Sequence, residues 1–145
     1  MSDILTVSQI KVPGSATTKD EAIREAGQIL VDTGAVTPAY VDAMFEREKS
    51  VSTYMGNYLA IPHGTNEAKD EISASALSVV RYDQPIDWDG NETRFVVGIA
   101  GHEGGHLEIL GKIAVIFSDT DEVDKMIAAG SAEEVFALLN AVNEE

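Results

Sequence analysis

Apolar side chains in the first third of the chain recur at helical spacing, and polar capping residues bound them. Thr18 and Glu21, three residues apart, form the capping-box pattern that starts a helix. Gly34 then offers a stop, because glycine readily takes the conformation that ends a helix. The residues between them predict a first helix with one apolar face, made of Ala22, Ile23, Ala26, Ile29 and Leu30.

A second helix is predicted directly after the first. Thr37-Pro38 supplies a cap followed by proline at the first helical position, where its missing N–H costs nothing. Val41, Met44 and Phe45 then share one face. We expect this helix to run to about Glu48 and so to end close to Arg47.

The last third of the chain predicts three more helices. The segment after Gly105 is apolar around most of its circumference, which is typical of a buried helix. Two short helices follow, one ending at Gly130 and one capped by Ser131 with Glu134. Their apolar stripes are Val123, Met126 and Ile127, and then Val135, Leu138, Leu139 and Val142.

Short apolar runs between the helices predict strands. Residues 58–61 and 74–82 are two such runs, and the continuous run at 95–100 is typical of a strand buried on both faces. We expect an additional edge strand around residues 4–12, and Asp89-Gly90 marks a turn.

Alternating helices and strands favour an α/β fold. We expect a mixed, mostly parallel sheet with helices on both faces. The length of 145 residues suits one domain over 1–145, since a chain of this size buries about two thirds of its unfolded surface. No internal repeat or Pro- and Ser-rich linker interrupts it.

Composition narrows the possible functions. Ten basic residues stand against 25 acidic ones, and the resulting net charge of −15 opposes binding to nucleic acid or to an anionic membrane. The absence of cysteine excludes thiolate catalysis, disulfides and cysteine-rich zinc sites. The chain has no long uncharged apolar run for membrane insertion and no basic start of a signal peptide, so we expect a cytoplasmic protein.

His63 is the first candidate for chemistry. It lies in Ala60-Ile61-Pro62-His63-Gly64-Thr65, between a stiff residue and a permissive one, which predicts an imidazole fixed at the end of a strand. Because the ordinary pKa of histidine is about 6.5, such a ring can act as a nucleophile or a proton shuttle. The alternative is a solvated histidine on a surface turn.

Arg47 and the segment after it suggest an anion site. Ser52, Thr53, Tyr54, Gly56 and Asn57 offer hydroxyls, an amide and an accessible backbone, and a guanidinium matches phosphate oxygens. The alternative is that Arg47 is a surface residue favoured by the helix dipole.

Three segments together resemble a known family: Arg47-Glu48-Lys49, residues 52–57 and residues 60–65. They are similar to the mannitol and fructose class of enzyme IIA, the phosphocarrier domain of the bacterial sugar phosphotransferase system. Asn66-Glu67-Ala68-Lys69-Asp70 looks more like the mannitol branch. The resemblance implies that His63 accepts a phosphoryl group on its tele nitrogen, and that no metal or cofactor takes part.

The same resemblance implies partners and supporting residues. The donor would be the histidine phosphocarrier protein, and the acceptor a cysteine on the mannitol-type enzyme IIB of the membrane permease. Arg47 and His106 would steady the phosphoryl oxygens. We expect Gly64, Thr53 and Asn57 to support the phosphate. The alternative within the same fold is a regulatory module that controls a kinase or a transcription regulator.

The stretch His102-Glu103-Gly104-Gly105-His106 matches the HExxH pattern of zinc proteases, which leaves a zinc hydrolase as a remote alternative. That motif must lie within a helix, whereas each glycine there costs about 1 kcal/mol relative to alanine. We expect a loop that ends at a helix start, with His106 beside the backbone N–H groups that favour an anion. His102 is expected to be a solvated loop residue.

Overall fold

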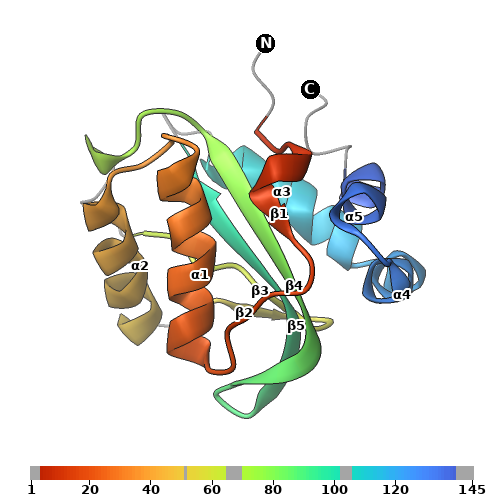
Figure 1. Ribbon diagram of the computed structural model, residues 1–145. Coiled ribbons are helices and arrows are strands. Elements are labelled where there is room, and N and C mark those ends of the chain that lie inside the picture. Colours follow the sequence, from red (N-terminus) through yellow and green to blue (C-terminus); the bar gives the residue numbers. More distant parts are fainter. Residues whose placement is uncertain (1–3, 51, 65–69, 102–105, 140–145) are drawn as a thin grey trace.

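The computed structural model describes residues 4–50, 52–64, 70–101 and 106–139 as a five-stranded sheet with helices on both faces (Figure 1). The strand order is β1-β4-β5-β3-β2. The strands are β1 (Ile10–Lys11), β2 (Tyr54–Gly56), β3 (Leu59–Ala60), β4 (Ala76–Trp88) and β5 (Asn91–Ala100). The helices are α1 (Lys19–Asp32), α2 (Pro38–Ser50), α3 (His106–Phe117), α4 (Thr120–Ala128) and α5 (Ala132–Leu139).

The two N-terminal helices begin where their caps predict. The Thr18 hydroxyl accepts a hydrogen bond from the Glu21 N–H at 3.2 Å, as the capping box requires. After α1, Gly34 takes a φ of +82°, a conformation that glycine reaches without steric cost. α2 begins at Pro38 and ends two residues beyond Glu48. Both expectations are therefore confirmed.

The sheet is mixed, as expected, but the expectation that it is mostly parallel is wrong. β1 with β4 and β3 with β5 are parallel pairs, whereas β4 with β5 and β2 with β3 are antiparallel. The reason is the turn at Asp89-Gly90, where both residues have positive φ, 53° and 92°. So short a connection can join only antiparallel strands, and it aligns β4 with β5 from Ala76 opposite Ala100 to Trp88 opposite Asn91.

Several elements differ from the predictions. β4 runs to Trp88 rather than ending at residue 82, and β5 begins at Asn91 rather than at residue 95. β2 was not predicted, since its three residues carry no apolar run; it forms a hairpin with β3 through Asn57 and Tyr58, which have φ of 51° and 69°. The N-terminal edge strand is confirmed in place but is short. A 3-10 turn over Val7–Gln9 takes up much of the segment and leaves two residues for β1.

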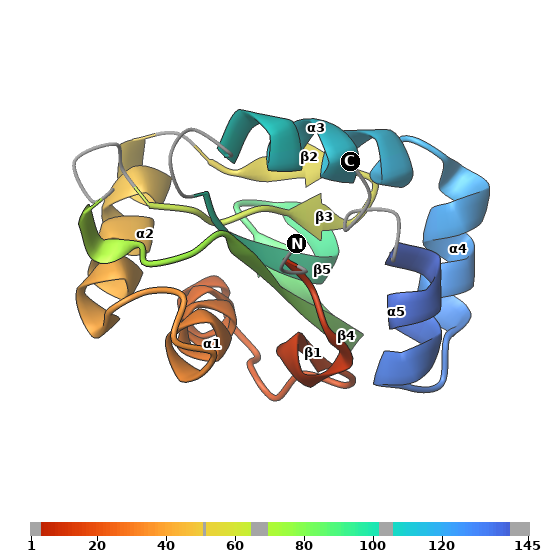
Figure 2. The same ribbon diagram turned by 90° about the horizontal axis from the view of Figure 1, so that it is seen from above.

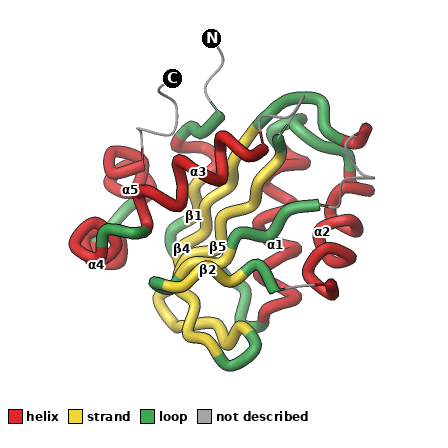
Figure 3. Tube along the Cα trace, turned by 180° about the vertical axis from the view of Figure 1, so that it is seen from behind, coloured by secondary structure: helices red, strands yellow, loops and turns green. Residues whose placement is uncertain are grey.

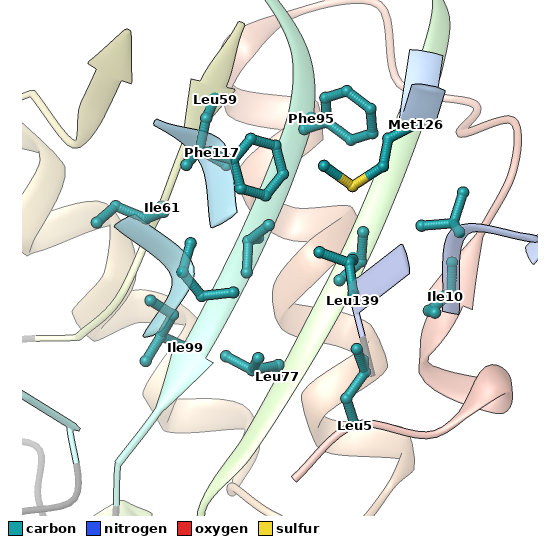
Figure 4. Packing of buried hydrophobic residues seen from close by; sticks show 14 of the residues in the cluster. Leu5, Ile10, Leu59, Ile61, Leu77, Phe95, Ile99, Phe117, Met126 and Leu139 are labelled. Atoms are coloured by element: carbon teal, nitrogen blue, oxygen red, sulfur yellow. The ribbon is translucent and has the colours of Figure 1, made fainter. Parts of the chain in front are cut away.

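Strand side chains alternate between two hydrophobic cores, one on each face of the sheet. In β4, Leu77 and Val79 pack in the core with α3, α4 and α5, while Ala76 and Val80 pack in the core with α1 and α2. Figure 4 shows the first core, where strand side chains face those of the three C-terminal helices. β5 is buried on both faces in the same way, which confirms the prediction from its continuous apolar run.

α3 lies on the face of the sheet away from α1 (Figure 2). Its inner face is buried through Ile109, Ile113 and Phe117, and the Phe117 ring meets Phe95 edge-on at 5.4 Å between centroids. Val115 is 71% exposed, so the expectation of a helix buried all round is wrong. The reason is that nothing in the described chain covers the outside of α3, which Figure 3 shows in front of the sheet. A membrane crossing would need a longer apolar helix than any in the described part of the chain.

Glu25 joins the N-terminal segment to the rest of the fold. Its carboxylate accepts hydrogen bonds from the Lys11 Nζ at 2.6 Å, the Ser15 Oγ at 2.7 Å and the Tyr82 hydroxyl at 2.7 Å. Burial by itself raises the pKa of Glu25, but these donors outweigh burial and lower the pKa from 4.5 to about 2. The folded state therefore holds this carboxylate in its charged form.

The lowered pKa predicts an acid-dependent loss of stability. A carboxylate whose pKa falls on folding stabilises the native state above the unfolded pKa, and this contribution is lost as the pH drops toward the folded value. We expect the free energy of unfolding of the wild type to fall more steeply between about pH 5 and about pH 2 than that of Glu25→Gln. Urea unfolding across this range measures the difference.

Glu133→Gln is the matched control for that experiment. Glu133 is an exposed carboxylate in the first turn of α5. Glu133→Gln removes the same charge without removing a hydrogen-bonded network. The free energy of unfolding of this variant should therefore fall with decreasing pH as steeply as that of the wild type. Equal slopes for wild type and Glu25→Gln would contradict the assignment to Glu25.

Candidate functional site

His63 prolongs β3 beyond its last paired residue. It forms a parallel bridge with Ile99 of β5, and the Ile99 N–H donates to the Pro62 carbonyl at 3.1 Å. The predicted place at a strand end is therefore confirmed. His63 is only 7% exposed, so a reacting group must come into close contact with this edge of the sheet to reach it.

The imidazole of His63 is oriented by its own backbone. Its Nδ1 lies 2.7 Å from the carbonyl oxygen of Ile61, two residues earlier. A carbonyl can only accept a hydrogen bond, so this contact requires the proton on Nδ1 and leaves the lone pair on Nε2. In the neutral ring, Nε2 is therefore the nitrogen with the basic lone pair.

Tyr40 of α2 contacts the chain on the other side of His63. Its hydroxyl donates to the Ile99 carbonyl at 2.7 Å and accepts from the Gly64 N–H at 2.9 Å. A Cβ added to Gly64 would lie 2.5 Å from the Cε1 atom of Tyr40, closer than nonbonded carbons approach. The glycine of the predicted Pro-His-Gly segment is thus required by the neighbouring ring.

Arg47 lies in the last turn of α2 and is half-buried. The next residue, Glu48, is buried, and its carboxylate accepts from the Thr53 N–H at 3.0 Å and from the Trp88 Nε1–H at 3.1 Å. Lys19 of α1 forms an ion pair with the same carboxylate at 3.5 Å. These bonds join the end of α2 to three other parts of the chain, which fixes the backbone that carries Arg47.

Thr53 and Asn57, expected to support a phosphate, use their side chains elsewhere. The hydroxyl of buried Thr53 donates to Glu48 at 2.5 Å. The Asn57 amide donates to the Phe117 carbonyl at 2.8 Å, at the opposite end of α3 from His106. A helix of this length spans about 18 Å, so the expected phosphate contact of Asn57 has no support in this geometry. The role of Thr53 stays a prediction.

His106 is the first residue of α3, so the predicted helix start after the glycine-rich loop is confirmed. Parallel strands β3 and β5 end at the same edge of the sheet, and α3 starts beyond the end of β5. The first turn of α3 and His63 therefore share that edge. His102, Glu103, Gly104 and Gly105 lie outside the described residues. Within the described residues no cluster of three metal-binding side chains occurs.

Two residues of the site were not predicted from the sequence. Tyr40 follows the helix cap Thr37-Pro38 and precedes Val41 on the inner side of α2. A tyrosine among core residues needs a hydrogen-bond partner, and this is the signal that points to it. Glu48 is four residues after Met44, so helical spacing places a charged side chain on the buried face. Neither pattern identifies the partner.

Known proteins share the sequence pattern and the fold of this chain. The profile of the family described as "Phosphoenolpyruvate-dependent sugar phosphotransferase system, EIIA 2" matches residues 3–142. The mannitol-specific phosphotransferase enzyme IIA component of Halalkalibacterium halodurans is 54% identical over 141 residues, which are 97% of this chain and 97% of the relative.

Two solved structures share the fold over nearly the whole chain. The crystal structure of IIA mannitol from Escherichia coli has a TM-score of 0.86 at 35% identity and covers 93% of this chain and 98% of its own. The Escherichia coli complex of IIA mannitol with phosphorylated IIB mannitol contains a chain with a TM-score of 0.89 at 34% identity, covering 94% and 97%.

The buried Glu48 predicts a large loss of stability on truncation. In Glu48→Ala, the Trp88 indole N–H and the Thr53 N–H lose their acceptor, and each buried donor left without a partner costs about 1–3 kcal/mol. We expect the free energy of unfolding to fall by about 2 kcal/mol or more. Glu46→Ala, at an exposed position of the same helix, should cost about 0.5 kcal/mol or less. Equal losses in chemical unfolding of the two variants would contradict the assignment.

Proposed function

Because the chain belongs to the EIIA 2 family of the phosphoenolpyruvate-dependent sugar phosphotransferase system, we propose that it carries a phosphoryl group on Nε2 of His63. One observation carries the choice of atom: the Nδ1 of His63 lies 2.7 Å from the Ile61 carbonyl, which leaves the lone pair on Nε2. This nitrogen is the tele position that the resemblance implies.

The proposed donor is the phosphorylated histidine phosphocarrier protein, and the proposed acceptor is a cysteine of a mannitol-type enzyme IIB in the membrane permease. The support is a relative named as mannitol-specific and a similar chain solved with phosphorylated IIB mannitol. The 145 residues contain no cysteine, so the acceptor thiol lies outside them. On this proposal the protein acts in the cytoplasm, without nucleic acid or a bound cofactor.

The transfer needs positioning and charge stabilisation more than acid–base chemistry. The Nε2 lone pair of His63 attacks phosphorus in line while the bond from phosphorus to the donor imidazole breaks, and the donor nitrogen recovers that electron pair. The proton stays on Nδ1 and is donated in a hydrogen bond to the Ile61 carbonyl, which stabilises the positive charge that the ring gains. In the second transfer a thiolate sulfur attacks phosphorus, and Nε2 recovers its pair.

The phosphoryl oxygens need positive partners. We assign this role to Arg47 at the end of α2 and to His106 at the start of α3, where backbone N–H groups and the helix dipole also favour an anion. The Glu48 network supports the role of Arg47 because it fixes the end of α2. The N–H of Gly64 donates to Tyr40, so on this proposal Gly64 supports the phosphate only by its place in the chain next to His63.

Phosphorylation with purified components tests the acceptor. Incubation with labelled phosphoenolpyruvate, enzyme I and the histidine phosphocarrier protein should place one acid-labile phosphoryl group on the wild type and none on His63→Ala. NMR of the imidazole nitrogens should assign it to Nε2. His102→Ala removes an imidazole from the predicted loop and should be labelled as the wild type is.

Absence of label on the wild type would overturn the proposal, as would label that persists in His63→Ala. The zinc-hydrolase alternative gives a different result. It requires one zinc ion per chain in the purified protein, lost in His106→Ala, and we expect no such metal.

Transfer to enzyme IIB tests the pathway. Purified phosphorylated chain should lose its label to the cysteine of a mannitol-type enzyme IIB at least about tenfold faster than to a fructose-type one, because partners must bring the two reacting atoms into line. If the chain passes its label to neither enzyme IIB, the result favours the regulatory alternative, in which phosphorylation of His63 controls another protein.

A further inference from the structure

The Tyr40 hydroxyl contacts both chains beside the parallel bridge between His63 and Ile99. In a parallel ladder the Ile99 N–H donates to the residue before His63, and the Ile99 carbonyl then accepts from the residue after it. The first bond is present, from Ile99 to the Pro62 carbonyl at 3.1 Å. At the second, the Tyr40 hydroxyl contacts both groups, donating to the Ile99 carbonyl at 2.7 Å and accepting from the Gly64 N–H at 2.9 Å.

We propose that Tyr40 is a positioning residue for His63, whose hydroxyl holds the chain beyond the imidazole at a set distance from β5. This proposal rests on the proposed function of His63 as the phosphoryl carrier. Tyr40 acts through the backbone of Gly64 and contacts no reacting atom in this assignment. Its role is to fix the direction in which Nε2 points.

The remaining contacts of the segment show why this one matters. The backbone groups of Ile61 and of Ile99 in β5 hold the chain up to His63. The side chains of both residues pack in the core with α3 (Figure 4). Pro62 restricts its own φ. The backbone before His63 is therefore fixed by the core, and the glycine after it is the flexible side. The Tyr40 hydroxyl fixes that flexible side.

Tyr40 is itself firmly held. It is 3% exposed, and its backbone N–H donates to the Thr37 carbonyl at 3.0 Å in the first turn of α2. Its ring approaches Gly64 so closely that a methyl group there would lie 2.5 Å from Cε1. Burial raises the pKa of the Tyr40 phenol above its ordinary value of 10, so the hydroxyl keeps its proton and remains a donor at neutral pH.

A hydroxyl suits this position, because its single oxygen donates and accepts at once. Phenylalanine keeps the ring but leaves the Gly64 N–H and the Ile99 carbonyl facing each other. The two groups then either join directly, which draws the chain toward β5, or stay without a partner. The first outcome moves His63 and the second removes a restraint on the chain beside it. A displacement of about 1 Å can slow an in-line transfer about a hundredfold.

Tyr40→Phe tests the proposal, with Tyr82→Phe as its matched control. Tyr82 is also buried, and its hydroxyl donates to Glu25 at 2.7 Å. Tyr82 is five residues along β4 from Leu77, the residue that pairs with Ile99. Each variant loses one hydrogen-bonded phenol oxygen. Both should lower the thermal midpoint, whereas only Tyr40→Phe should change the behaviour of His63.

Two measurements separate positioning from stability. The nitrogen chemical shifts of His63 in the unphosphorylated protein report the proton on Nδ1, and we expect Tyr40→Phe to shift them toward a mixture of tautomers. The rate of phosphorylation at saturating donor should fall between about tenfold and about a hundredfold. Tyr82→Phe should leave both readouts as in the wild type. A Tyr40→Phe protein with wild-type shifts and a rate within about twofold of wild type would overturn the proposal.

A second variant keeps the test decisive if Tyr40→Phe does not fold. Gly64→Ala keeps the hydroxyl but forces the Tyr40 ring away, so it should change the same His63 signals from the other side. Unchanged signals in folded Gly64→Ala would also overturn the proposal. The chemical shifts need no phosphoryl donor, so they test the positioning even if the wild type accepts no label and the proposed function itself fails.

Discussion

The parallel pairing of β3 with β5 is the constraint on which the site depends. This short ladder carries the backbone from Leu59 through Ala60 to the bridge between His63 and Ile99. This bridge holds His63 beyond the end of β3 while keeping it attached to the sheet. The hydrophobic cores on the two faces of the sheet hold both strands, so packing on both sides fixes the backbone next to His63.

A backbone carbonyl and a side-chain hydroxyl hold the segment that carries the His63 imidazole. The Ile61 carbonyl faces Nδ1, and the Tyr40 hydroxyl fixes the next peptide.

Local patterns predicted much of this fold because caps, turns and periodicity act over a few residues. Thr18 with Glu21 placed the start of α1, and the Pro-His-Gly segment placed His63 at a strand end. The predictions failed where the deciding contact is distant in sequence. β2 forms because β3 offers it a partner, and Val115 is exposed because nothing described packs on the outside of α3.

The sequence by itself determined the residue types of the site: a histidine between proline and glycine, an arginine at a helix end and a second histidine at a helix start. Only the tertiary structure decided which groups hold His63: the Ile61 carbonyl that faces Nδ1 and the Tyr40 hydroxyl that contacts Gly64. Tyr40 and Ile99 are far apart in the chain, and their hydrogen bond exists because α2 packs on the sheet that contains β5. A hydrogen bond depends on distances of a few tenths of an ångström, and such distances are set by packing rather than by residue order.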